Sequence, residues 1–167
     1  QNDTTICQGD SIELSVVSSS VADGPSDFGG SLNNGLVAYY PFNGNANDES
    51  GNGNNGTVSG ASLVRDRGGR LNSAYGFDGT NDFIEISDSP ELNFTDTMSI
   101  SFWLKPDSWG VRPDDTPGII SKMRDNNNEG YVIYHDGNFR EKLNFRSIGD
   151  DYHVTNTEAV SGQWDHW

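Results

Sequence analysis

The segment MSISFWLKP (98–106) decides the fold of this chain. Its apolar side chains recur at every second position: Met98, Ile100, Phe102 and Leu104. A period of two places these side chains on one face of a β-strand. Adjacent strand residues point to opposite sides, so Trp103 cannot share the core with Phe102. We therefore predict a strand with one buried face and with Trp103 on the outer face or under a loop.

Segments of the same kind recur at a spacing of about 8–12 residues, which is typical of a β-sandwich. No window holds a sustained helical period of 3.6 residues. We therefore predict an all-β fold, a sandwich or jelly roll of two antiparallel sheets. Two of the strands, 73–79 and 82–86, are expected to lie around a Gly-Thr-Asn turn. The other predicted strands are 36–42, 57–64, 118–122, 130–136, 142–147 and 152–156.

The chain of 167 residues carries 25 acidic and 10 basic residues, a net charge of −15. Nucleic-acid binding needs clustered Lys and Arg, and an acidic surface also repels anionic lipid. Either divalent-cation binding or simple solubility explains this charge. The single Cys7 excludes an internal disulfide framework, and no apolar run reaches the ~18 residues of a membrane span. We expect no nucleic-acid partner and no direct membrane insertion.

The composition divides the chain into three regions. Residues 1–17 hold short strand-like segments, 18–35 have the Ser/Gly/Asn/Asp composition of a linker, and 36–167 hold the predicted sandwich. The chain ends at GQWDHW (162–167), which resembles the start of another strand. Because a sandwich must cover its edges, we expect an incomplete domain, truncated at its C-terminus. Residues 36–167 alone are therefore not expected to fold stably.

Several segments together resemble the laminin-G-like, concanavalin-A-like lectin domain of bacterial surface proteins. They are LVAYYPFNGNANDESGNGNNGTVSG (36–60), SAYGFDGTNDFIEI (73–86), MSISFWLKP and GQWDHW. The resemblance extends over 36–167 and implies a two-sheet jelly roll with one structural Ca²⁺. It also implies that the domain binds a carbohydrate or a protein. The closing strands of that family, which supply part of the metal site, are absent from this sequence.

The N-terminal segment DTTICQGDSIEL (3–14) resembles the opening of an Ig-like repeat in surface proteins of Bacteroidota. Those proteins often leave the cell by type IX secretion and serve adhesion or gliding motility. The resemblance therefore implies a secreted protein at the cell surface.

The loop NGNANDESGNGNNG (43–56) carries side-chain oxygens at alternate positions, on Asp48, Ser50 and Asn52. Calcium takes roughly six to eight hard oxygen ligands, and a glycine-rich loop can add backbone carbonyls. A solvated turn rich in Asn and Asp has the same composition. The resemblance to the lectin domain favours Ca²⁺, with Asp48 as the principal ligand and Asp78 as a weaker candidate.

Polar loops flank the predicted strand 130–136 and are candidates for ligand binding, because such sites commonly lie on loops. Asp125 and Asn127 precede this strand, and Asp136 lies at its end. Trp109 is a candidate aromatic for stacking on a sugar ring. A plain hairpin turn is the alternative interpretation. Other aromatics that can stack on sugar rings when exposed are Tyr131, Tyr134 and Tyr152.

No pattern in the chain predicts catalysis. Glycosidases need paired carboxylates. Glu85 and Asp88 are three positions apart, so they would point to opposite faces, and Asp88 lies past the end of the strand 82–86. The chain also lacks a Gly-x-Ser-x-Gly elbow and a phosphate-binding loop. We predict a non-catalytic adhesion or recognition module of a larger exported protein. The alternatives are a structural spacer, a cargo fragment held by the secretion machinery, and an accessory domain of a glycan-processing enzyme.

Overall fold

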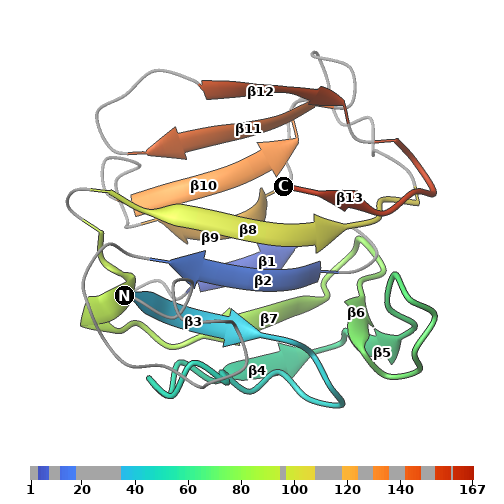
Figure 1. Cartoon of the computed structure of the whole chain (residues 1–167), viewed down its shortest axis with the longest axis horizontal. Coiled ribbons are helices and arrows are strands. Elements are labelled where there is room, and N and C mark those ends of the chain that lie inside the picture. The colour runs from blue at the N-terminus through green and yellow to red at the C-terminus, as the bar shows by residue number, and fades with distance from the viewer. Residues whose placement is uncertain are drawn as a thin grey trace.

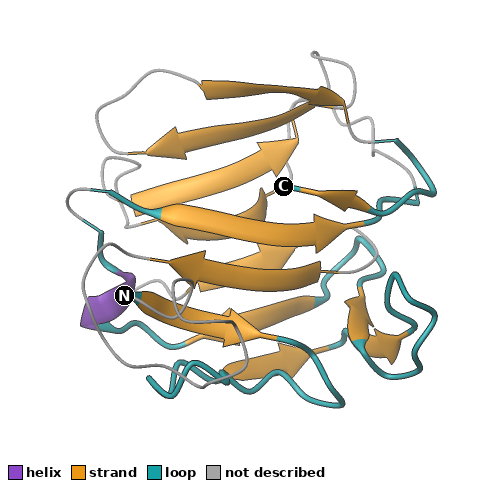
Figure 2. Cartoon of the chain, viewed as in Figure 1, coloured by secondary structure: helices purple, strands orange, loops and turns teal. Residues whose placement is uncertain are grey.

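The computed structural model describes residues 4–7, 12–17, 35–94, 97–107, 118–123, 130–135, 142–147, 153–158 and 160–167. The described elements are strands except for one 3₁₀ turn, η2 (Pro90–Leu92) (Figure 2). The strands are β1 (Thr4–Cys7), β2 (Ile12–Val17), β3 (Leu36–Tyr40), β4 (Gly56–Ser59), β5 (Ser62–Val64), β6 (Ala74–Gly76), β7 (Phe83–Ile86), β8 (Ser99–Leu104), β9 (Gly118–Met123), β10 (Gly130–His135), β11 (Lys142–Ser147), β12 (His153–Glu158) and β13 (Asp165–His166).

These strands form two packed sheets and a small hairpin (Figure 1). The larger sheet has seven strands in the order β12-β11-β10-β9-β1-β7-β4, and the smaller has four in the order β13-β8-β2-β3. The hairpin pairs β5 with β6. Neighbouring strands run antiparallel throughout. The predicted all-β fold of two antiparallel sheets is confirmed. No helix among the described residues has the length and apolar character needed to cross a membrane.

The N-terminal region differs from the predicted organisation, in which residues 1–17 stood apart from the sandwich. β1 pairs with β7 and β9 inside the larger sheet. β2 lies between β3 and β8 inside the smaller sheet. The predicted linker therefore joins two neighbouring strands of one sheet, although all of it except Gly35 lies outside the described residues. Strand periodicity indicates that a segment is extended, but it does not say which strand it pairs with.

The pairing around the Gly-Thr-Asn turn also differs from the expected arrangement. β6 pairs with β5 in the small hairpin, whereas β7 joins β1 and β4 in the larger sheet. The turn itself is built as predicted, but it carries the chain from one sheet to another.

The core lies between the two sheets and is filled by alternate residues of their strands. In β8, Phe102 and Leu104 are buried, while Trp103 is half-buried on the opposite face. This confirms the prediction that Phe102 and Leu104 face the core and that Trp103 lies on the other face. Burial of each large apolar side chain stabilises the fold by about 1.5–3 kcal/mol. The most deeply buried apolar members of the cluster are Ala38, Tyr40, Phe42, Ile84, Leu104, Ile119, Ile120 and Leu143.

The interior also contains an ion pair between Lys122 of β9 and Asp88, which follows β7. Lys122 is 5% exposed and lies opposite Tyr131 in the ladder, so the two share a face of the sheet. Removing one partner of a buried pair costs about 3–5 kcal/mol, because the other charge is left uncompensated. Asp88 thus has a structural role, because it holds the segment after β7 against β9.

Deletion of residues 1–17 should abolish cooperative unfolding of the chain. The deletion removes an interior strand from each sheet, separating β7 from β9 and β3 from β8. A domain with a total stability of about 5–15 kcal/mol does not survive that loss. Circular dichroism during heating should show no sharp transition. A deletion variant that melts at the wild-type temperature would instead show that this segment is independent of the sandwich.

Candidate functional site

The loop 43–56, which we call the Asp48 loop, is organised around one carboxylate. Asp48 Oδ1 accepts hydrogen bonds from the backbone N–H groups of Tyr39 and Ser50, both at 2.9 Å. Asp48 Oδ2 accepts from the Ser50 hydroxyl at 2.8 Å and from the backbone N–H of Asn54 at 3.0 Å. The residue is only 9% exposed. Each carboxylate oxygen therefore already holds two donors in a buried position.

Two asparagines fasten the same loop to β3. Asn52 Nδ2 donates to the carbonyls of Leu36 and Val37 at 2.9 and 3.0 Å, and Asn54 Nδ2 donates to the carbonyl of Val37 at 3.1 Å. From the strand side, the hydroxyl of Tyr40 donates to the carbonyl of Asn54. Burial, with the Asp48 charge as the next cause, raises the pKa of Tyr40, so this hydroxyl stays protonated as a donor.

The predicted metal ligands are only partly brought together. Asp48, Ser50 and Asn52 share the Asp48 loop, but Asp78 caps its own turn by accepting a hydrogen bond from the N–H of Thr80 at 2.8 Å. No group of three or more His, Cys, Asp or Glu side chains in the described ranges is placed to hold a metal. A cation at Asp48 would displace the donors already bound there. The residues therefore fit a hydrogen-bonded structural loop and do not fit a calcium site centred on Asp48.

A second group of side chains lies on the outer face of the smaller sheet. We call it the Trp103 cluster: Ser101 and Trp103 of β8, His166 of β13, and Arg67 of the loop between β5 and β6. Trp103 and His166 are opposite each other in the ladder, and their stacked rings have centroids 4.8 Å apart. Ser101 Oγ lies 2.7 Å from His166 Nε2. The Arg67 guanidinium carbon lies 4.3 Å from the centroid of the Trp103 ring.

The turn at 65–70 holds Arg67 at this place through Asp66. Asp66 Oδ1 accepts from the N–H groups of Gly68 and Arg70 at 2.9 and 2.8 Å, and Asp66 Oδ2 pairs with Arg70 Nε at 2.7 Å. Desolvation raises the pKa of Asp66, but these hydrogen bonds outweigh it and hold the pKa below its ordinary value. The charged carboxylate therefore keeps the turn closed, with Arg67 at its tip.

The chemistry of the Trp103 cluster suits binding. An indole offers an apolar face, a guanidinium is attracted to that face and also binds anions, and Arg67 and His166 are exposed. The Ser101–His166 contact alone does not make a nucleophile and base. Catalysis would also need a group that orients the imidazole, and no described carboxylate bonds to His166.

Sequence reasoning found this cluster only in part. It placed Trp103 on the outer face or under a loop, because the side chains of adjacent strand residues point to opposite faces. It did not find Arg67, because the contact depends on a hairpin folding over a distant strand. The available signal was the basic segment RDRGGR (65–70) in an acidic chain.

The predicted ligand-binding residues Asp125, Asn127, Asp136 and Trp109 lie outside the described part of the chain, as does Tyr152. The other two aromatics considered for sugar stacking are not on the surface. Tyr131 and Tyr134 are 5% and 6% exposed, and a register shift in the ladder lies between Ile133 and Tyr134.

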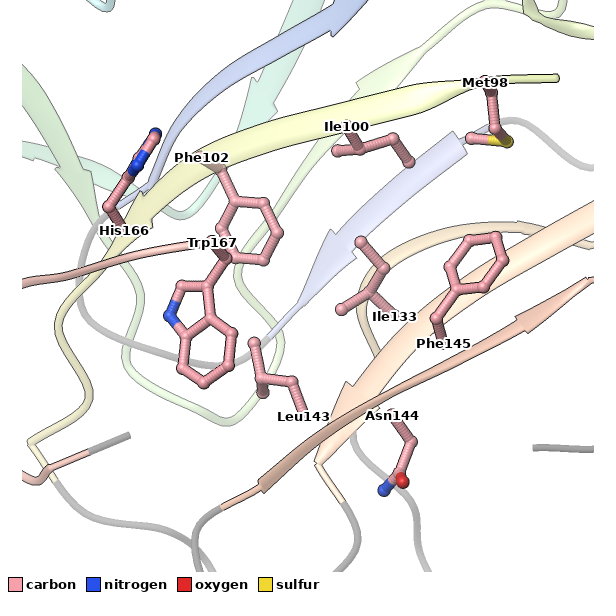
Figure 3. A pocket seen from close by; sticks show the side chains of 9 residues that line it. All are labelled: Met98, Ile100, Phe102, Ile133, Leu143, Asn144, Phe145, His166 and Trp167. Carbon is pink, nitrogen blue, oxygen red and sulfur yellow. The ribbon is translucent and has the colours of Figure 1, made fainter. Parts of the chain in front are cut away.

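A cavity of about 490 Å³ lies between the two sheets beside β8 (Figure 3). Ile100 and Phe102 of β8 line one side, and Ile133, Leu143 and Phe145 of β10 and β11 line the other. Trp167 stands between them at one end, and the amide of Asn144 is turned away from these apolar groups. The space is therefore mainly apolar.

Comparison with protein families agrees with this fold. The model of the Concanavalin A-like lectin/glucanases superfamily matches residues 78–167, more than half of the chain. The chain belongs to this superfamily, and membership supports a non-catalytic binding module in general terms. The matched region includes β8 and β13 but not the Asp48 loop or Arg67. No curated protein and no solved structure gave a significant match.

Replacing Asp48 should destabilise the domain whether or not calcium is present. Asp48→Ala leaves several donors without an acceptor at about 1–3 kcal/mol each. Because the loop can relax and admit water, we expect a total loss of about 2–4 kcal/mol in the free energy of unfolding. Asp48→Asn should be nearly as harmful, since its amide nitrogen cannot accept from Ser50 or Asn54. Urea titration measures both effects.

Glu49→Ala is the matched control, because it removes a neighbouring exposed acid whose side chain has no bond in this network. All three variants are compared with the wild type in EGTA and in Ca²⁺. A structural role predicts equal losses in the two buffers. Calcium stabilisation of the wild type that disappears in Asp48→Ala would contradict this prediction and establish the metal site.

Proposed function

We propose that this domain is a non-catalytic adhesion module that binds a negatively charged glycan through the Trp103 cluster. The observation that carries the proposal is the grouping of an indole, an imidazole and a guanidinium on an exposed sheet face. The indole holds the guanidinium of Arg67 and the imidazole of His166 together through contacts with its ring. The guanidinium can pair with a carboxylate or another anionic group of the same ligand.

The charge distribution favours an anionic ligand at this place. The chain as a whole carries −15, so most of its surface repels anions. The segment 65–70 instead holds three arginines and one aspartate. Arg67 is the arginine of this segment that lies against the Trp103 ring, where it adds positive charge.

The same module is proposed to act at the cell surface as part of a larger exported protein. The support is the resemblance of 3–14 to a repeat of surface proteins and the acidic composition of the chain. Adhesion through a glycan, in a protein exported by type IX secretion, is consistent with both. A role in gliding motility is one form that such adhesion can take.

Arg67→Ala should weaken binding to carboxylated and sulfated glycans by about tenfold, which corresponds to 1.4 kcal/mol. Trp103→Ala should reduce binding to the same glycans at least as much, because Arg67 and His166 lose the ring that positions them. The measurement is a glycan array followed by titration calorimetry on the acidic glycan that binds best. Binding should also weaken with added salt, because exposed charges are screened.

Arg146→Ala is the matched control, since it removes an exposed arginine from β11 of the other sheet. It should leave glycan affinity unchanged. Equal losses in the two arginine variants would show non-specific charge attraction and refute the site. Binding of neutral glycans alone, or no glycan binding by a folded chain, would also refute it.

A further inference from the structure

His166 is the member of the Trp103 cluster whose side chain can change its charge near neutral pH. It lies opposite Trp103 in the ladder between β13 and β8, and its exposed ring stacks on the indole. In Figure 3 this ring points to the other side of β13 from Trp167. Imidazole is the side chain whose charge ordinarily changes between about pH 5 and pH 8, whereas a guanidinium stays charged. The cluster therefore joins a permanent cation, Arg67, to a titratable ring.

The hydroxyl of Ser101 accommodates either charge state of that ring. Ser101 Oγ lies 2.7 Å from His166 Nε2. A hydroxyl both donates and accepts hydrogen bonds, so it can donate to a neutral ring or accept from a protonated one. Both ring nitrogens carry hydrogen in the protonated form, so Nδ1–H then supplies a second donor. Protonation thus adds a charged donor to the site without breaking the contact with Ser101.

The groups that β8 and the loop 65–70 bring to this ring are uncharged or basic. Ser101 and Trp103 contact it from β8, and Lys105 follows directly after that strand. From the loop, Arg67 contacts the same indole. An anion bound among these groups would favour a further positive charge on the ring, because opposite charges at short distance stabilise each other.

Two acidic residues belong to the neighbouring strands. Asp165 of β13 accepts a hydrogen bond from the N–H of Val160 at 3.1 Å, and as the residue next to His166 it lies on the other face of the strand. Glu13 occupies the position of β2 opposite Trp103, so β8 lies between Glu13 and β13. Within the described ranges no carboxylate bonds to His166, and an anionic ligand can therefore supply the counter-charge.

We infer that His166 is a second, proton-dependent cation of the proposed glycan site, so that the domain binds sulfated glycans more tightly as the pH falls. This inference rests on the proposed function and adds the regulation of the same site. At higher pH the anionic group pairs with Arg67 alone, and at lower pH it also accepts a charged hydrogen bond from the imidazolium. Because the protonated domain binds the anion better, binding also takes up a proton.

The test is titration calorimetry of the full chain with a sulfated glycan at about pH 5.5 and about pH 7.5, on either side of the ordinary imidazole range. A sulfate ester keeps its negative charge at both values, so a change in affinity comes from the protein. The wild type should bind about fivefold more tightly at the lower pH, because a charged hydrogen bond is stronger than a neutral one. Repeating the titration near pH 6.5, the ordinary imidazole midpoint, in buffers of different ionisation enthalpy should show proton uptake.

Two substitutions separate the charge of His166 from its other contributions. His166→Gln never carries the charge, so its affinity should be low at both pH values and its binding should take up no proton. His166→Lys carries a charge at both values, so its affinity should be high at both. Every other titratable group is retained in these variants, and their melting temperatures confirm that they are folded.

Equal affinities of the wild type at the two pH values would overturn the inference and leave the proposed glycan site standing, provided that Arg67→Ala still weakens binding. A pH dependence that persists unchanged in His166→Gln would also overturn it, because another group would then be responsible. Absence of binding by the folded wild type at both pH values would refute the proposed function and the inference together.

Discussion

In the part of the chain that the structure describes, a sheet of four strands packs on a sheet of seven, and the rest of the structure depends on this packing of two apolar faces. The inward side chains of strands near the middle of the larger sheet pack in the core and are almost fully buried. On the side of β10 and β11, the large indole of Trp167 packs against the core, although this residue follows the short edge strand β13. The side chains around Ile100 leave a cavity between the two sheets.

Three of the acidic residues hold turns of the chain. Asp48 gathers donors from the loop and from β3, Asp66 closes the turn that carries Arg67, and Asp78 caps the turn before β7. Backbone N–H groups around a carboxylate do locally what a cation would do, because their hydrogen bonds stabilise its negative charge. Positive φ angles at Gly51 and Gly53 let the Asp48 loop turn back toward its own carboxylate.

Local patterns predicted the strands, but they did not predict which strands lie together. MSISFWLKP has a clear period of two, so the burial of Phe102 and Leu104 and the outward position of Trp103 could be derived from the residues alone. The places of β1 and β2 inside the sheets, and the contact of Arg67 with Trp103, depend on pairing between distant segments. The calcium role of Asp48 stays a prediction for a related reason. Alternate oxygens suit either a cation or backbone N–H groups, and only the folded loop shows that the donors come from the chain.

The strand β8 serves both the core and the proposed glycan site because its faces alternate. The inner side chains of β8, from Ile100 to Leu104, belong to the core and to the cavity wall. Its outer side chains, Ser101 and Trp103, contact His166 on the next strand. A one-residue change of register would exchange these roles, placing serines in the core and phenylalanine on the surface. The ladder between β2 and β8 pairs six residues of each strand, so it fixes the register on which both faces of β8 depend.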